Sequence, residues 1–248
     1  LLKRAGGSGG GHIRPSAAGA CRPGFYRQRR APGSPVSLAF LADGRGARGF
    51  AVPAQWVEPS PGAPFRYGGA VDPGACAPAL RAGLDRAADA ITAATGLRGL
   101  ASLDALAEGE SWWLLEVNPR PGATLDVLDR RPTPLLLQHV EACLGRLPEP
   151  EAAPGAAASA IVYAGAGVAA APAFDWPDHV LDRPEPASRI PAGAPLCTVV
   201  AAAADRDAAL ALLNARIGPV RDAFHTGDLA HAPAHQPAER QPPRGAAR

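Results

Sequence analysis

The sequence Glu-Val-Asn-Pro-Arg at residues 116–120 follows an apolar run at residues 112–115, and it constrains the fold more than any other segment. Side chains alternate between the two faces of an extended strand, so Glu116, Asn118 and Arg120 are expected on one side. A carboxylate and an amide oxygen suit Mg²⁺, and a guanidinium suits a phosphate. The two prolines that flank Arg120 cannot donate hydrogen bonds to a neighbouring strand. The segment therefore predicts a magnesium–nucleotide site at the end of a β-strand.

A second carboxylate is expected opposite Glu116. Residues 100–106 alternate as a strand does, and residues 108–110 are typical of a hairpin loop. If the loop centres near Glu110, Asp104 falls opposite Glu116 on the same face, where two carboxylates repel unless a cation lies between them. Asp104, Glu116 and Asn118 are therefore the predicted metal ligands. The alternative is that Asp104 sits in a solvated turn and Glu116 pairs with a lysine, and a register shift of one residue would turn Asp104 to the other face.

A glycine-rich segment at residues 6–11 follows Lys3 near the start of the chain. Glycines let consecutive backbone N–H groups turn toward an anion, and a nearby lysine supplies positive charge. No Gly-Lys-Ser/Thr sequence follows, which disfavours a P-loop NTPase. The same composition is also typical of a flexible linker. The metal motif further along the chain favours a phosphate-binding loop.

These two segments together resemble the ATP-grasp superfamily. Residues 115–122 (Leu-Glu-Val-Asn-Pro-Arg-Pro-Gly) resemble its metal-binding strand, and Lys3 with the glycines resembles the lysine-bearing strand and the flexible loop that closes over the ATP phosphates. The resemblance extends over about residues 1–130, and residues 182–199 fit the small β-rich piece of biotin-carboxylase-like members. Within the superfamily, the chain looks most like the predicted ATP-dependent carboligases found beside one-carbon metabolism genes in methylotrophs.

The resemblance implies an enzyme that uses ATP and Mg²⁺ (or Mn²⁺) to convert a carboxylate into an acyl phosphate, which an amine or similar nucleophile then attacks. Lys3 and Arg120 would have catalytic roles. Many family members carry a glutamate in the hinge segment where this chain has Gln28. The implied nucleotide-binding residues are Lys3, Gly6, Gly7, Gly9, Gly10 and Gln28.

Two other functions stay open at this point. One is activation of bicarbonate, as in biotin carboxylase, in place of amide formation. The other is a nucleotide-binding regulatory module or an inactive fragment. The expected partners are a small-molecule carboxylate and a nucleophile, and a homodimer is the assembly considered.

Composition excludes several other classes of protein. The chain has 248 residues, a net charge of +2 and 47% hydrophobic residues, which is typical of a globular protein and gives no indication of nucleic-acid binding. No apolar run approaches the roughly 18 residues of a membrane span, and no secretory signal opens the chain. The four cysteines form no CxxC pair, which argues against a zinc site and fits a cytoplasmic protein. The absence of methionine suggests an N-terminally truncated fragment.

The order of patterns predicts an α+β fold: an ATP-grasp nucleotide-binding domain, an antiparallel sheet with packed helices, followed by a small β-rich subdomain. The expected divisions are a partial ATP-grasp domain at 1–145, a linker at 146–158, a small α/β subdomain at 159–229 and a disordered tail at 230–248. The expected elements are strands at 36–42, 48–52, 159–163 and 196–201, a long loop at 53–77, and helices at 78–95, 135–144 and 205–216, the last ended by Gly218.

Overall fold

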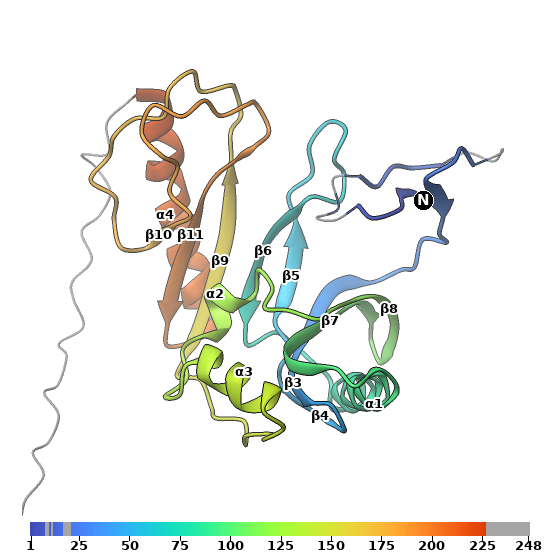
Figure 1. Ribbon diagram of the computed structural model, residues 1–248. Coiled ribbons are helices and arrows are strands. Elements are labelled where there is room, and N and C mark those ends of the chain that lie inside the picture. Colours follow the sequence, from blue (N-terminus) through green and yellow to red (C-terminus); the bar gives the residue numbers. More distant parts are fainter. Residues whose placement is uncertain (8–9, 11, 17–20, 227–248) are drawn as a thin grey trace, which may run out of the picture.

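A large antiparallel sheet dominates the fold (Figure 1). The structure is a computed structural model that describes residues 1–7, 10, 12–16 and 21–226. Within these residues the sheet has nine strands in the order β10-β11-β9-β6-β5-β3-β7-β8, with β4 also paired to β3. The strands are β3 (Ser34–Asp43), β4 (Ala47–Ala51), β5 (Ala54–Val57), β6 (Tyr67–Asp72), β7 (Arg98–Glu108), β8 (Ser111–Asn118), β9 (Ala156–Tyr163), β10 (Val180–Leu181) and β11 (Pro195–Ala203).

A second, two-stranded sheet lies near the start of the chain. It consists of β1 (Leu2–Arg4) and β2 (Phe25–Arg27), which are antiparallel. Figure 1 shows this small sheet to one side of the large one. β1 and β2 therefore form a separate sheet and add no strand to the large one.

Helices cover both faces of the large sheet. On one face, α1 (Pro78–Thr95) packs on β3 and β7, and α4 (Arg206–Thr226) packs on β9 and β11. On the other face, α2 (Leu125–Leu128) and α3 (Leu135–Cys143) contribute Val127 and Leu135 to a core with Leu41 of β3. Because side chains alternate along β3, its even-numbered residues face α1 and its odd-numbered residues face α2 and α3.

Several elements agree with the sequence prediction. Helix α1 has the predicted bounds, and Gly96 ends it with a φ of 69°, in the left-handed region that favours glycine. The predicted strand at 36–42 lies within β3, and its predicted partner at 48–52 is β4. Asp205 accepts a hydrogen bond from the Ala208 backbone N–H at 2.9 Å and so caps α4. The antiparallel sheet with packed helices is the predicted fold class.

The prediction of a long loop at 53–77 is wrong. β5 and β6 lie within it, and β6 is an inner strand between β5 and β9. Glycines are unfavourable in most strands, but a Cβ on Gly69 would lie 2.2 Å from the Ser159 carbonyl oxygen and 2.3 Å from the Trp56 ring. The close approach of these strands therefore requires glycine at this position.

The predicted end of the last helix is also wrong. α4 continues through Gly218 and Pro219 to Thr226, because its buried residues Leu213, Val220 and Ala223 keep one face against the sheet. Tertiary packing here outweighs the low helix propensity of glycine and proline. Among the described residues, none of the helices is both long and apolar enough to cross a membrane.

The second half of the chain extends the same sheet. β9 begins at Ala156, inside the stretch expected as a linker, and pairs with β6, so the strands from β8 to β10 form one continuous sheet. The division into domains stays a prediction. The expected tail at 230–248 lies outside the described residues, as does Gly9.

Candidate functional site

Asp104 on β7 and Glu116 on β8 are direct cross-strand partners. Near the hairpin, Glu108 pairs with Ser111, which without interruption would set Leu115 opposite Asp104. A bulge between Asp104 and Ala105 shifts the register by one residue. It turns Glu116 away from the face that α1 covers and places it beside Asp104. The predicted pairing is therefore confirmed, although a bulge and not the loop position produces it.

Asn118 joins this pair at the end of β8. Its side-chain Nδ2 donates a hydrogen bond to Asp104 Oδ2 at 2.8 Å, so the two side chains lie on the same face of the sheet. The strand ends at Asn118, where the prolines begin. Two carboxylates and one amide thus meet at the open end of β8.

Ser37 holds the other oxygen of Asp104. Its hydroxyl donates to Asp104 Oδ1 at 2.7 Å, and Ser37 is 1% exposed. Burial raises the pKa of Asp104; the Ser37 hydrogen bond opposes this rise, and the nearby charge of Glu116 adds to it. Sequence reasoning missed Ser37, although it is the one hydroxyl in the apolar run of β3 that is in register with Asp104.

Arg120 lies just beyond the strand. Its side chain is exposed and donates to the Pro121 carbonyl oxygen at 2.9 Å, and its charge lowers the pKa of Asp104 in opposition to burial. Its predicted catalytic role stays a prediction.

Tyr67 of β6 also belongs to this face of the sheet. Burial raises the pKa of its hydroxyl, and the charges of Asp126 and Asp104 raise it further. The hydroxyl oxygen is buried and has no hydrogen-bond partner among the described residues. Tyr163 of β9 donates to the Tyr67 carbonyl oxygen at 2.7 Å and fixes this end of β6. The sequence prediction placed this segment in a long loop and so missed the buried Tyr67 hydroxyl on this face of the sheet.

The predicted phosphate-binding residues lie on the N-terminal segment. Lys3 is on β1 opposite Tyr26 of β2, and no described contact joins it to Asp104 or Glu116. Gly6 and Gly10 both have positive φ angles, 70° and 73°. A Cβ on Gly10 would lie 2.0 Å from the Phe65 carbonyl oxygen, so Gly10 packs against the chain just before β6.

Gly7 and Gln28 take part in the local structure of this segment. Gly7 lies against the His12 ring, since a Cβ on Gly7 would be 2.5 Å from it. The Gln28 backbone N–H donates to the Leu1 carbonyl oxygen at 3.0 Å, and the Leu1 amino group donates to the Gln28 carbonyl oxygen at 2.8 Å. These contacts extend the β1–β2 pairing. The nucleotide-binding roles of these residues stay predictions.

The carboxylates fit a hard divalent cation by the chemistry of their donor atoms. The described residues contain no cluster of three or more His, Cys, Asp or Glu side chains placed to hold a metal. Asp104 and Glu116 form a pair instead, completed by the amide oxygen of Asn118, which is left over when its nitrogen donates to Asp104. Oxygen ligands of this kind suit Mg²⁺.

Solved structures share this fold at low sequence identity. The biotin carboxylase domain dimer of the Hydrogenobacter thermophilus 2-oxoglutarate carboxylase, in complex with MgADP, ADP and bicarbonate, matches with a TM-score of 0.60 and 10% identity over 77% of this chain and 49% of that chain. An L-amino acid ligase from Bacillus licheniformis matches with a TM-score of 0.59 and 12% identity over 73% and 49%. The biotin carboxylase domain of a single-chain bacterial carboxylase matches with a TM-score of 0.58 and 17% identity over 84% and 55%.

The chain thus spans about half the length of these solved chains. No curated protein matches the sequence significantly. The model of the ATP-grasp domain family matches residues 1–124, which include Lys3, Asp104, Glu116 and Asn118. This match covers half of the chain, and the antiparallel sheet agrees with it. The protein belongs to the ATP-grasp family.

Proposed function

We propose that the chain is the nucleotide-binding part of an ATP- and Mg²⁺-dependent ligase that activates a carboxylate as an acyl phosphate. The observation that carries this proposal is the cross-strand pair of Asp104 and Glu116 with Asn118 at its side. Two carboxylates in direct opposition destabilise a sheet unless a cation lies between them. A bound Mg²⁺ neutralises charge on the phosphate oxygens of ATP during phosphoryl transfer.

Each residue of the site would then have its own role. Asp104 and Glu116 would hold the metal from opposite strands, and Asn118 would add its amide oxygen. Ser37 keeps the Asp104 carboxylate in one orientation through its hydrogen bond. Arg120 would bind the oxygens of the transferred phosphoryl group or of the acyl phosphate.

The proposed reaction has two steps. A carboxylate oxygen of the substrate attacks the γ-phosphorus, the bond from that phosphorus to the bridging oxygen breaks, and ADP leaves. A nucleophile, which we propose to be an amine, then attacks the acyl carbon, loses a proton and displaces inorganic phosphate. The glycines after Lys3 would close over the phosphates and keep water away from the acyl phosphate. This reaction is that of a carboxylate–amine ligase.

Calorimetric titration of the chain with MgATP tests the nucleotide site. Glu116→Gln should abolish binding, whereas Glu108→Gln, an exposed carboxylate on the same hairpin, should leave it unchanged. In the full-length protein, ADP release that requires a carboxylate together with an amine supports the ligase reaction. ADP release that requires only bicarbonate would replace it with a carboxylase reaction, and equal binding by Glu116→Gln would refute the site.

A further inference from the structure

A cavity of about 420 Å³ lies at the Asp72 end of β6, and we call it the second cavity because the candidate metal site is the first site of interest. Asp72 and Arg131 line it together with apolar atoms of Phe50, Val52 and Ala152. Asp72 is separated from Asp104 by β5 and β3, three inter-strand spacings or roughly 14 Å across the sheet. This cavity is therefore distinct from the carboxylate pair.

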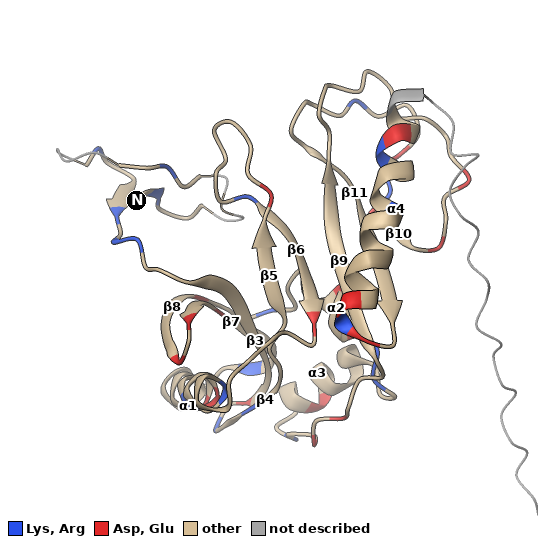
Figure 2. Ribbon diagram, turned by 180° about the vertical axis from the view of Figure 1, so that it is seen from behind, with Lys and Arg blue, Asp and Glu red and all other residues tan. Residues whose placement is uncertain are grey.

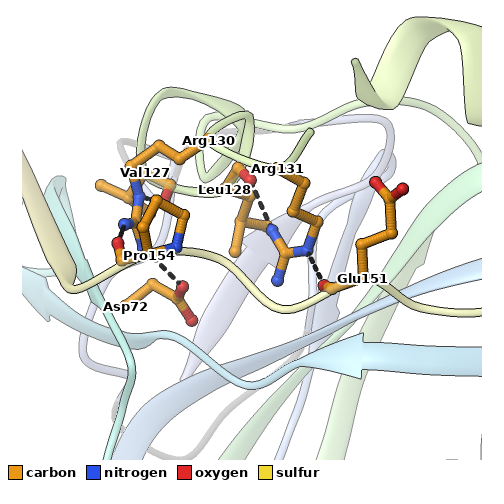
Figure 3. A network of polar contacts seen from close by, with 7 residues as sticks. All are labelled: Asp72, Val127, Leu128, Arg130, Arg131, Glu151 and Pro154. Atoms are coloured by element: carbon orange, nitrogen blue, oxygen red, sulfur yellow. Dashed lines mark hydrogen bonds and ion pairs between the residues drawn. The ribbon is translucent and has the colours of Figure 1, made fainter. Parts of the chain in front are cut away.

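Arg131 is held rigidly in the wall of the cavity (Figure 3). Its Nε donates to the Glu151 carbonyl oxygen at 2.9 Å, and its Nη1 donates to the Leu128 carbonyl oxygen at the end of α2. The Phe50 ring lies against the guanidinium, with its centroid 4.8 Å from Cζ. Only 8% of Arg131 is exposed, yet its Nη2 donates to none of the described residues.

Asp72 is the acidic residue of the cavity, and only one of its two carboxylate oxygens has a partner among the described residues. Its Oδ2 pairs with Arg130 Nη2 at 3.0 Å, and Arg130 also donates to the Val127 and Pro154 carbonyl oxygens. Asp72 is 6% exposed, and its Oδ1 accepts no hydrogen bond from the described residues. Figure 3 shows this second oxygen and the third nitrogen of Arg131 without contacts to the residues drawn.

The other charged groups around the cavity already have partners. Arg81 pairs with Asp85 at 2.7 Å and donates to the Gly49 carbonyl oxygen. The Glu151 carboxylate accepts from both the Thr133 backbone N–H and its hydroxyl. The cavity therefore offers one donor atom on a cation and one acceptor atom on an anion, neither hydrogen-bonded to the described residues, with no large excess of either charge.

A ligand that hydrogen-bonds to both atoms would take the place of solvent in the cavity and form two charge-assisted hydrogen bonds. A carboxylate matches the free Nη2 of Arg131, and an ammonium matches the free Oδ1 of Asp72. The apolar wall formed by Phe50, Val52 and Ala152 suits a hydrocarbon side chain. We propose that this cavity binds a small zwitterion, namely an apolar α-amino acid, through Arg131 and Asp72.

Cys76 makes the proposal measurable because its thiol lines the same cavity. L-Leucine should slow alkylation of Cys76 by iodoacetamide, by about tenfold at a concentration ten times its Kd. The exposed Cys143, which is outside the cavity, is the internal control, and its rate should not change. Both rates are read from one digest by mass spectrometry.

Two leucine analogues test the charge pairing. 4-Methylpentanoate lacks the ammonium, and 3-methylbutylamine lacks the carboxylate; each should protect Cys76 far less than leucine does. Equal protection by either analogue would overturn the zwitterion assignment. Lack of protection by leucine at tens of millimolar would overturn the binding site itself.

Variants locate the ligand by calorimetry. Arg131→Met should abolish leucine binding, but Arg131 also supports α2, so loss of fold would obscure that result. Ala152→Phe avoids this difficulty, since Ala152 is exposed at the cavity and its side chain has no polar atom. It should block leucine, whereas Ala166→Phe, exposed and outside the cavity, should not. Unchanged leucine binding by Ala152→Phe would refute the location.

Discussion

Asp104 and Glu116 face each other because one extra residue is accommodated in β8, between the hairpin and the pair. In a regular ladder Glu116 would lie on the face that α1 covers, beside Trp112 and Leu114. The bulge places it instead on the face that carries Ser37 and Tyr67. Figure 2 shows acidic segments, in red, on the β7–β8 hairpin next to α1.

The first prediction concerns the repulsion between these two carboxylates. Asp104→Asn keeps the shape of the side chain and removes one charge, so the metal-free variant should be more stable than the wild type by roughly 0.2–1 kcal/mol. Mg²⁺ with ATP should raise the Tm of the wild type and not that of the variant. Thermal unfolding with and without MgATP measures both effects, and an equal Tm shift in the two proteins would contradict the metal role of Asp104.

The second prediction is the pH dependence of the same comparison. Burial raises the pKa of Asp104 above its ordinary value of 3.8, so the folded state binds this proton more tightly than the unfolded state. Stability linked to Asp104 is therefore lost as pH rises from 3.8 through the raised pKa. The advantage of Asp104→Asn should be absent at the acid end and should open across this window. Urea unfolding of both proteins at a series of pH values tests it, and a constant difference would be the contrary result.

The third prediction assigns a positioning role to Ser37. Ser37→Ala removes one of the two hydrogen bonds that orient Asp104, and MgATP affinity should fall roughly 10- to 100-fold, as for other groups that orient metal ligands. Ser159→Ala is the matched control, a buried serine on β9. Calorimetry at fixed Mg²⁺ measures the change. Equal affinities in the two variants would remove Ser37 from the site.

The residues of the candidate metal site were predictable from sequence because they sit on a hairpin with strong alternation and proline at its end. The bulge was not, since no residue type specifies it and its effect is a single step in register. Asp104 and Glu116 still pair as predicted, because the hairpin turns half a residue earlier than expected and the bulge restores the register.

Other features depend on contacts between distant parts of the chain. β6 contains Gly68 and Gly69, which lower strand propensity, and only packing against Trp56 and β9 makes them favourable. In the sequence Asp72 is notable only as the residue before Pro73, yet in the structure it pairs with Arg130, 58 positions later. Local patterns carry no information on such pairings, so the second cavity was invisible in the sequence.

The fourth prediction tests the junction between β6 and β9. Gly69→Ala places a Cβ within 2.2 Å of the Ser159 carbonyl oxygen, and neither strand can retreat without losing ladder hydrogen bonds. Overpacking of this kind costs roughly 1–3 kcal/mol. Gly165→Ala is the control, since its Cβ would meet nothing within 4 Å. Urea midpoints that fall equally in both variants would show that the close approach is unimportant.

The fifth prediction contrasts a buried ion pair with an exposed one. Asp72→Ala leaves Arg130 without its carboxylate and Arg131 without a nearby negative charge, and breaking such a buried pair costs roughly 3–5 kcal/mol. Arg146→Ala removes an ion pair with Glu141 that lies on the surface, where water screens the attraction, so its unfolding midpoint should match that of the wild type. Denaturant unfolding of the two variants side by side decides the point. A midpoint for Asp72→Ala close to that of Arg146→Ala would mean that water reaches both arginines when the carboxylate is absent, and the rigid wall assigned to the second cavity would be wrong.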